Sequence, residues 1–418
     1  MIGAARAVDL LSRRELSAEG LLRDCLEQIR AREPLVQAWE ALHEQGALRE
    51  ARRIDALSER PPLCGLPVGI KDLIDVAGLP SGYGSPIYRG HRPQADAACV
   101  RLLRAAGAVI VGKTVTTEFA AYAPGKTRNP RDPERTPGGS SSGSAAAVAC
   151  GMVPLALGTQ TAASVIRPAS FCGVIGWKPS FGALPLEGVH PLAPSLDTLG
   201  FFVRELADVP LALAALGAPL AKPDARSAAR RPVLALCRTE AWDRAEPSTR
   251  AALEDFAARI GAREVTLGPR FDGLVEAQIA IMGAEAAVSL RREREQEPGK
   301  LSARLREFLE LGRAVAPEQL ARAHEQAAAC SRELAEILQG VDAVLTPAAA
   351  GEAPRGLAFT GDPLFGRIWT LLGGPCVSLP LLRGPAGLPL GVQLVSARGR
   401  DAALLAAAEW LWNQRADA

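Results

Sequence analysis

The chain has 418 residues, of which 48% are hydrophobic and 22% charged, and its formal net charge is +2. A chain of this length can bury a large core, as one big domain or as two closely packed ones. The near-neutral charge balance, with no long basic stretch, gives no electrostatic support for binding to nucleic acid or a membrane surface.

Several protein classes are disfavoured by what the sequence lacks. No apolar run reaches the length of a membrane-spanning helix, and the first seven residues lack the apolar block of a signal peptide. The eight cysteines form no Cys-x-x-Cys pair, which disfavours zinc sites and disulfide frameworks and favours a reducing cytoplasm. The four histidines follow no metal-ligand or nucleophile-elbow pattern. We therefore expect no metal and no cofactor, and a catalytic base that is not histidine.

The first half of the chain predicts a helical arm followed by an α/β core. In residues 1–60, Leu22, Cys25, Leu26 and Ile29 share one face of a helix. In residues 61–204, short apolar strands alternate with helices, which is typical of a sheet covered on both faces. We expect strands near 66–70, 108–112, 153–157 and 171–179, and helices near 96–107 and 145–150.

The second half first changes in composition, and strand patterns then return near the C-terminus. Residues 205–340 are rich in Ala, Arg, Glu and Leu, and are expected to be mostly helical and to shape a substrate pocket. Helices are predicted near 248–260, 272–297, 300–312 and 317–339. Residues 341–418 predict strands near 341–347, 373–380 and 387–395, and a closing helix at 401–414. Because the strands before 200 and after 340 resemble parts of one sheet, we predict one domain with a large mixed central β-sheet.

The most unusual stretch is the run GGSSSGSAAA at 138–147, which contains Gly139 and Ser140. Glycine permits backbone conformations that other residues resist, and serine is a weak nucleophile until another group takes its proton. A flexible linker would not pass directly into a small-residue helix and a buried strand. A second serine, Ser164, follows 24 residues after Ser140, and Lys71 ends a short apolar strand.

These features resemble the amidase signature family. The resemblance rests on the Gly-Gly-Ser-Ser run, the spacing of the two serines and the segment GLPVGIKD at 65–72, and further family-like segments extend it over most of the chain. It implies a Ser–cis-Ser–Lys triad, with Ser164 as nucleophile, Ser140 as proton relay at a cis peptide bond and Lys71 as base. Lys71 must then be neutral, and burial lowers a lysine pKa. A second candidate, Lys113, is predicted to be a solvated charge at a strand end, and Asp197 to cap a turn.

The turn before Ser164 is the expected oxyanion site. The backbone N–H groups of Thr161, Ala162 and Ala163 can converge with that of Ser164 on one oxygen. The usual family turn reads Asp-Thr-Gly-Gly-Ser, whereas this chain has Gln160 and two alanines. Because alanine does not readily adopt positive φ, we predict negative φ at both alanines. A turn strained by them would instead favour a catalytically weak binding protein.

Three further residues are predicted to bind substrate: Arg167, Thr159 and Gly139. Arg167 lies three residues after Ser164, as in malonamidase-like members, and the resemblance implies that it holds a substrate carboxylate. The alternative is a structural arginine bonded to backbone carbonyls. Because proline restricts the residue before it, Pro168 predicts extended backbone at Arg167.

The sequence thus predicts an amidase that converts a carboxylic amide to a carboxylate and ammonia or an amine, through an acyl-Ser164 intermediate. A small carboxylate-bearing amide is one candidate substrate class. The alternatives are a glutaminase-type subunit of a tRNA-dependent amidotransferase, which needs partner proteins, and a weak binding protein on the same fold. The expected partner is a small-molecule amide, with no nucleic acid and no membrane, and the sequence leaves a homodimer open.

Overall fold

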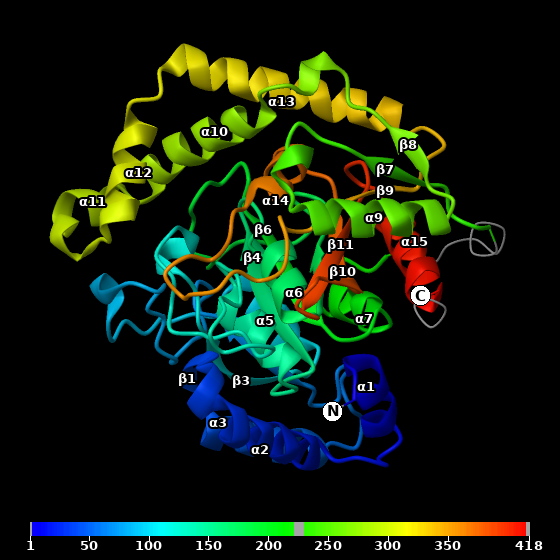
Figure 1. The fold of residues 1–418 in the computed structure, drawn as a ribbon. Helices are drawn as coiled ribbons and strands as arrows, with labels where there is room; N and C mark the ends of the chain where they lie inside the picture. Colours follow the sequence, from blue (N-terminus) through cyan, green and yellow to red (C-terminus); the bar gives the residue numbers. More distant parts are fainter. Residues whose placement is uncertain (1, 221–229, 415–418) are drawn as a thin grey trace.

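The computed structural model describes residues 2–220 and 230–414 (Figure 1). Within these ranges, 11 strands form one sheet in the order β1-β3-β2-β4-β6-β5-β10-β11-β9-β7-β8. The strands are β1 (Trp39–Leu42), β2 (Pro67–Lys71), β3 (Val109–Thr114), β4 (Leu155–Gln160), β5 (Ile175–Lys178), β6 (Thr198–Val203), β7 (Leu234–Cys237), β8 (Arg263–Val265), β9 (Ala343–Pro347), β10 (Cys376–Arg383) and β11 (Pro389–Val395). Parallel pairs such as β2–β4 and antiparallel pairs such as β10–β11 occur together, so the sheet is mixed, as predicted.

Helices surround this sheet. The α-helices in the described ranges are α1 (Ala4–Ser12), α2 (Ala18–Val36), α3 (Glu44–Asp55), α4 (Ala98–Ala105), α5 (Ser142–Ala149), α6 (Ile166–Cys172), α7 (Asp208–Ala215), α9 (Pro247–Arg259), α10 (Leu274–Ser289), α11 (Arg291–Gln296), α12 (Ala303–Arg313), α13 (Pro317–Ile337), α14 (Leu364–Leu371) and α15 (Asp401–Asn413). Short 3-10 helices lie at Pro86–Tyr88, Glu118–Ala120, Trp242–Arg244, Pro269–Phe271 and Pro298–Lys300. No helix of the described ranges is both long and apolar enough to cross a bilayer.

β6 was not predicted from the sequence, and three further strands lie where the sequence pattern predicted helix. β1 lies in the predicted helical arm, and β7 and β8 lie in the predicted helical region. β1, β7 and β8 are only three or four residues long, and β8 reads Arg-Glu-Val with two exposed positions. Their hydrogen bonds to neighbouring strands, rather than their own periodicity, specify these elements.

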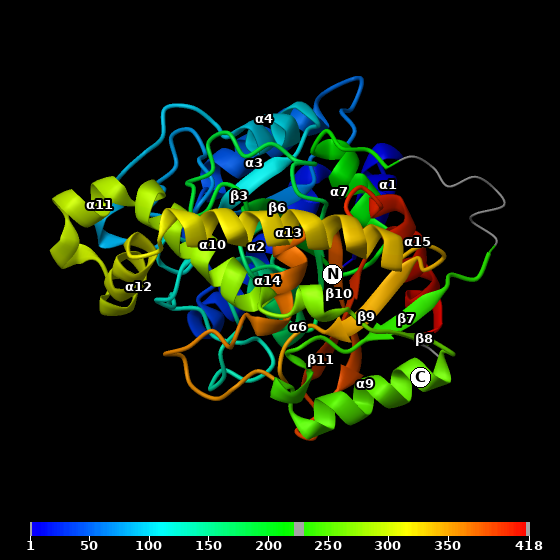
Figure 2. The same ribbon diagram turned by 90° about the horizontal axis from the view of Figure 1, so that it is seen from above.

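The two faces of the sheet are covered by different helices. α5 packs on β2, β3, β4 and β6, while α6 packs on β5, β10 and β11 and also touches α5. α15 packs on β9, β10 and β11 from the other side (Figure 2). α5 consists of Ser, Gly, Ala and Val, and a Cβ atom at Gly143 would lie 2.2 Å from the carbonyl oxygen of Ala38. Small residues are therefore required for this close packing.

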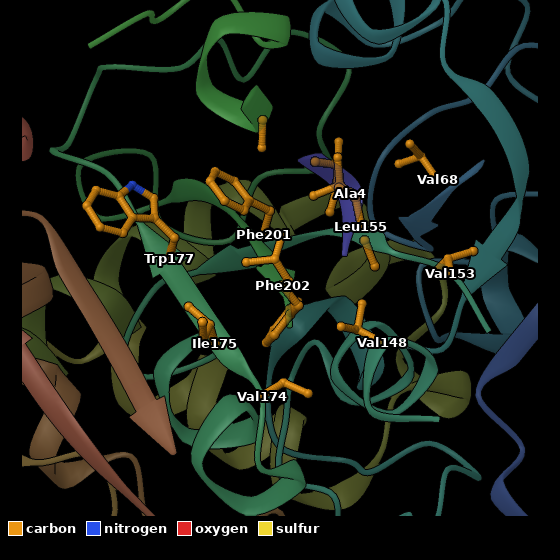
Figure 3. Packing of buried hydrophobic residues seen from close by; sticks show 14 of the residues in the cluster. Ala4, Val68, Val148, Val153, Leu155, Val174, Ile175, Trp177, Phe201 and Phe202 are labelled. Carbon is orange, nitrogen blue, oxygen red and sulfur yellow. The ribbon is translucent and has the colours of Figure 1, made fainter. Parts of the chain in front are cut away.

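The core around β4 positions the serine turn, which comprises residues 161–164 and ends at Ser164. Trp177 on β5 and Phe201 and Phe202 on β6 are fully buried and pack among aliphatic side chains such as Leu155 on β4 (Figure 3). Burial of each such side chain contributes about 1.5–3 kcal/mol. Because β2 and β4 are parallel neighbours, their carboxyl ends lie side by side at one edge of the sheet. Lys71 and the turn after Gln160 are thereby brought together.

The region between β8 and β9 forms a helical layer. α10 packs against α12, α13 and α14, and these helices lie at the opposite end of the molecule from α1, α2 and α3 (Figure 1). A separate apolar cluster joins this layer to the turn at Ala162 and to Phe119. Residues far apart in the sequence therefore meet above the serine turn.

Candidate active site

Lys71 is the last residue of β2 and is fully buried. Its Nζ donates hydrogen bonds to Ser140 Oγ and to Thr159 Oγ1, both at 2.7 Å. Burial lowers the pKa of Lys71 to about 7, although the negative charge of Asp197 acts in the opposite direction. The predicted burial is confirmed, and an amine with this pKa is half neutral near pH 7.

Lys113 is not the solvated charge that the sequence predicted. It lies at the end of β3, an inner strand between β1 and β2, and is fully buried. Its Nζ lies 2.9 Å from Asp72 Oδ1 and donates to Ser81 Oγ at 2.6 Å. Lys71, by contrast, has no carboxylate of a described residue within 4.0 Å. Burial lowers the pKa of Lys113 too, but the Asp72 carboxylate acts to raise it, whereas Lys71 has no such partner within the described ranges.

The serine run separates into one serine that contacts Lys71 and others that hold the backbone. The peptide bond between Gly139 and Ser140 is cis, as predicted. The other hydroxyls donate to backbone carbonyls: Ser141 to Thr159, Ser142 to Val115 and Ser144 to Leu157. Among the serines of this run, only Ser140 accepts a hydrogen bond from the low-pKa lysine, which marks it as the candidate relay.

The turn after β4 has its carbonyl groups fixed from outside. The Thr161 oxygen accepts from Gln278 Nε2 at 3.0 Å, the Ala162 oxygen from Thr370 Oγ1 at 2.6 Å, and the Ala163 oxygen from the Arg167 N–H at 2.9 Å. In a trans peptide the N–H points opposite to the preceding C=O. The N–H groups of Ala162, Ala163 and Ser164 therefore point away from these partners, and no described residue accepts from them. Neither alanine has positive φ, as predicted.

Gln160 stands where the usual family turn has aspartate, and its side-chain amide uses both its oxygen and its nitrogen in hydrogen bonds around the turn. Its Oε1 accepts from the N–H groups of Val165 and Ile166, at 2.9 and 3.1 Å, where α6 begins. Its Nε2 donates to Thr370 Oγ1 at 3.0 Å. The same hydroxyl donates to Ala162, so one amide side chain links the start of α6 to α14 and to the turn.

Arg167 is helical, and the predicted extended backbone is wrong. α6 begins at Ile166, so Pro168 lies in its first turn, where a missing N–H breaks no intrahelical hydrogen bond. The Arg167 side chain is buried, and its Nη2 donates to the Gly139 carbonyl at 2.7 Å and to Thr360 Oγ1 at 3.2 Å. Its Nε and Nη1 atoms are buried with no partner among the described residues.

Asp197 caps a turn, as predicted. Its Oδ2 accepts from the N–H groups of Leu192 and Ala193 at 2.9 and 3.0 Å, and its Oδ1 accepts from Thr161 Oγ1 at 2.6 Å. Burial raises the pKa of Asp197 to about 6, although these hydrogen bonds and Lys71 act to lower it. At neutral pH the carboxylate is therefore charged, and its hydrogen bond from Thr161 fixes the first residue of the serine turn.

A small cavity of about 50 Å³ lies beside this turn. Its walls are formed by Ala120, Ala121, Tyr122, Thr161, Ala162, Ser164, Arg167, Leu192, Met282, Phe359, Thr360, Gly361, Pro363 and Arg367. Ser164 and Arg167 thus share one cavity. Among the described residues, no hydrogen bond joins the Ser140 and Ser164 hydroxyls.

Thr159 and Gly139 do not lie on the wall of this cavity, so their predicted role in substrate binding stays a prediction. The Thr159 hydroxyl accepts from Lys71, and the Gly139 carbonyl accepts from Arg167, because these buried cations need acceptors. Thr159 therefore holds the side chain of Lys71, and Gly139 holds that of Arg167.

Three contributors were not found from the sequence: Gln278 on α10, and Arg367 and Thr370 on α14. Each is more than 100 residues from the serine turn, and each lies in a helix whose apolar pattern indicates only packing. No short motif marks them, since their contacts arise only when the helical layer closes over the turn.

Comparison with known proteins identifies the family. A family model described as Amidase matches residues 20–405. The chain belongs to the amidase family. A glutamyl-tRNA(Gln) amidotransferase subunit from Acidobacterium capsulatum is 32% identical, over 94% of this chain and 94% of that protein. The equivalent protein from Symbiobacterium thermophilum is 38% identical over 67% of this chain, and the match spans only 57% of that relative.

Solved structures agree with this membership. A solved amidase is 30% identical and superposes with a TM-score of 0.89, covering 99% of this chain and 100% of that one. A chain from a complex described as revealing the evolutionary origins of an s-triazine catabolic enzyme is 27% identical, with a TM-score of 0.91 over 99% and 98%. The predicted family and fold class are confirmed, and the comparisons support an amide-hydrolysing enzyme.

Proposed function

We propose that this amidase hydrolyses a carboxylic amide to a carboxylate and ammonia or an amine through an acyl-Ser164 intermediate. The observation that carries the proposal is the serine turn: a serine on a cavity wall beside backbone N–H groups that have no acceptor among the described residues. Such preorganised donors stabilise the negative charge that develops on a carbonyl oxygen. The buried, low-pKa Lys71 beside Ser140 provides a base.

The proton path runs through Ser140. Neutral Lys71 accepts the Ser140 proton, Ser140 accepts the Ser164 proton, and Ser164 Oγ attacks the amide carbon. The N–H groups of Ala162, Ala163 and Ser164 bind the oxyanion. The proton returns through Ser140 to the leaving nitrogen, and water then releases the acid by the same path. Because the two hydroxyls are not bonded to each other here, substrate binding must bring them into reach.

Arg167 supports a substrate that carries a carboxylate. The structural alternative accounts for Nη2, which is bonded to Gly139 and Thr360, but leaves Nε and Nη1 buried without partners in the described part of the chain. A buried unpaired donor costs free energy, and a substrate carboxylate would supply an acceptor for one of these two atoms. The cavity volume of about 50 Å³ favours a short acid such as malonamate.

The amidotransferase subunit is the second candidate, because the relatives at 32% and 38% identity carry that name. Such a protein works together with partner proteins, whereas an amidase works alone. The alternative of a weak binding protein rested on strain at the two alanines of the turn. It is no longer favoured, because neither alanine has positive φ.

Ammonia release by the isolated chain tests the proposal. We expect release from malonamate, and none from Ser164→Ala. Arg167→Ala should lower kcat/KM for malonamate by about 30- to 150-fold, while the neutral diamide malonamide is spared.

Two results would contradict parts of this scheme. Equal losses on the charged and the neutral amide would show that Arg167 is structural. Ammonia release only in the presence of the other amidotransferase components would favour the second candidate function.

A further inference from the structure

A second arginine lies on the wall of the same cavity. Arg367, on α14, is 6% exposed and shares the cavity with Arg167 and Ser164. Its Nη1 donates to Gln278 Oε1, and its guanidinium also faces the hydroxyl of Tyr122. The cavity wall therefore includes two arginines, from helices that lie about 200 residues apart in the sequence.

These two cations lack a nearby countercharge. Within the described residues, neither makes an ion pair within 4.0 Å. Asp362 interacts with both from the half-exposed rim, where it lies 3.8 Å from Arg244. Burial lowers the pKa of Arg167 to about 9, with Asp362 opposing that change and Arg367 adding to it, so Arg167 remains cationic at neutral pH. Two like charges sharing one small cavity repel, and an anion placed between them relieves both.

We propose that Arg367 is a second substrate-binding residue, so that the substrate carboxylate is held between Arg167 and Arg367. This inference rests on the proposed hydrolysis of a carboxylate-bearing amide and adds the residue that completes its anion subsite. Hydrolysis of such an amide produces a dicarboxylate, which keeps one carboxylate between the two arginines and gains a second negative charge within reach of their field. The short dicarboxylate product therefore binds more tightly than the neutral diamide of the same length.

Arg367 also touches the catalytic turn through Gln278. Gln278 Oε1 accepts from Arg367, which directs its Nε2 to the Thr161 carbonyl at 3.0 Å. A purely positioning role for Arg367 would act through this amide, whereas an anion-binding role would not need it. Gln278→Met separates the two roles, because it removes the amide and leaves both arginines.

Titration calorimetry with malonate tests the inference without turnover. We expect malonate to bind the full chain, and Arg367→Met to weaken its Kd by about 30-fold or more. Arg244→Met is the matched control, since it removes an arginine that is 69% exposed and pairs with Asp362 outside the cavity. It should change the Kd by less than about 2-fold. Gln278→Met should change the malonate Kd by less than about 3-fold while lowering kcat by about 10-fold.

Asp362→Asn gives a result of opposite sign on a residue whose side chain is 42% exposed. Loss of this negative charge should tighten malonate binding by about 2- to 5-fold. If Arg367→Met does not fold by circular dichroism, Arg367→Gln and Asp362→Asn carry the test.

The inference is overturned if malonate binds Arg367→Met as tightly as the unsubstituted chain, if Gln278→Met weakens it equally, or if Asp362→Asn leaves it unchanged. Failure of the proposed reaction looks different. A chain that binds malonate in an Arg367-dependent way but releases no ammonia would contradict the hydrolysis alone.

Discussion

At the scale of residues, two buried lysines at neighbouring strand ends have different surroundings. Lys113 lies 2.9 Å from Asp72, whereas the hydrogen bonds of Lys71 to described residues go to the hydroxyls of Ser140 and Thr159. Burial lowers the pKa of both lysines, and the Asp72 carboxylate opposes this at Lys113, whereas the neutral hydroxyls beside Lys71 do not. The sequence offered both lysines, and the position of Asp72 distinguishes them.

The pKa of Lys71 predicts the pH dependence of the reaction. Because only the neutral amine accepts a proton, kcat/KM for malonamate should rise with pH through about 7 and fall below it. Lys71→Ala should lower the rate by about 100- to 10,000-fold, and Ser140→Ala should cost less than Ser164→Ala. A pH–rate profile with these variants measures both effects. An unchanged rate in Lys71→Ala would refute its role as base.

Asp197 should tune that profile. Its negative charge acts to raise the pKa of Lys71, so Asp197→Asn should move the midpoint to lower pH. Asp208→Asn is the control, because Asp208 is also buried but caps the start of α1 and has no electrostatic effect resolved on Lys71. A midpoint that moves to higher pH, or that moves equally in the control, would contradict this assignment.

At the scale of elements, the sequence predicts what its own periodicity and motifs encode. The apolar run before Lys71 placed β2 to within one residue, whereas β4 extends to Gln160, beyond the predicted strand at 153–157. α6 was missed, because Pro168 was read as enforcing extended backbone, whereas the Gln160 side chain satisfies the first N–H groups of a helix there. The Arg-Glu-Val strand β8 has no strand periodicity at all.

The conformation of the serine turn depends on contacts with α14. Thr370 Oγ1 accepts a hydrogen bond from the Gln160 side-chain amide and donates one to the Ala162 carbonyl. α14 also packs closely on the turn, because a Cβ atom added at Gly366 would lie 2.6 Å from the Cβ atom of Ala163. Thr370→Val should lower kcat by about 10-fold with KM little changed, because the Ala163 N–H is no longer fixed. Thr370→Ser should restore most of the rate.

Thr346→Val provides the matched control for that substitution. Thr346 is buried on β9, and its hydroxyl has no partner among the described residues. Its loss should leave kcat unchanged. If both valine variants lose activity equally, the effect belongs to general packing rather than to the turn.

At the scale of the whole molecule, the cavity is assembled from five distant parts of one chain. Its wall takes residues from the segment at Ala120, the turn at Ser164, the segment at Leu192, α10 at Met282 and the segment from Phe359 to Arg367. The sequence motifs reveal only the second of these parts, and the positions of Arg367 and Gln278 come from the packing of α10 and α14. The candidate catalytic residues Lys71, Ser140 and Ser164 therefore lie in motifs that the sequence shows, whereas the cavity residues on α10 and α14 do not.

The most direct measurement is covalent labelling of the isolated chain with a serine-directed fluorophosphonate, mapped by peptide mass spectrometry. The account predicts one adduct on Ser164, formed faster as pH rises through about 7, absent in Ser164→Ala and strongly slowed in Lys71→Ala. Labelling at Ser140 or another serine, or malonamate turnover by a chain in which Ser164 is not labelled, would contradict the central claim that Ser164 is the nucleophile.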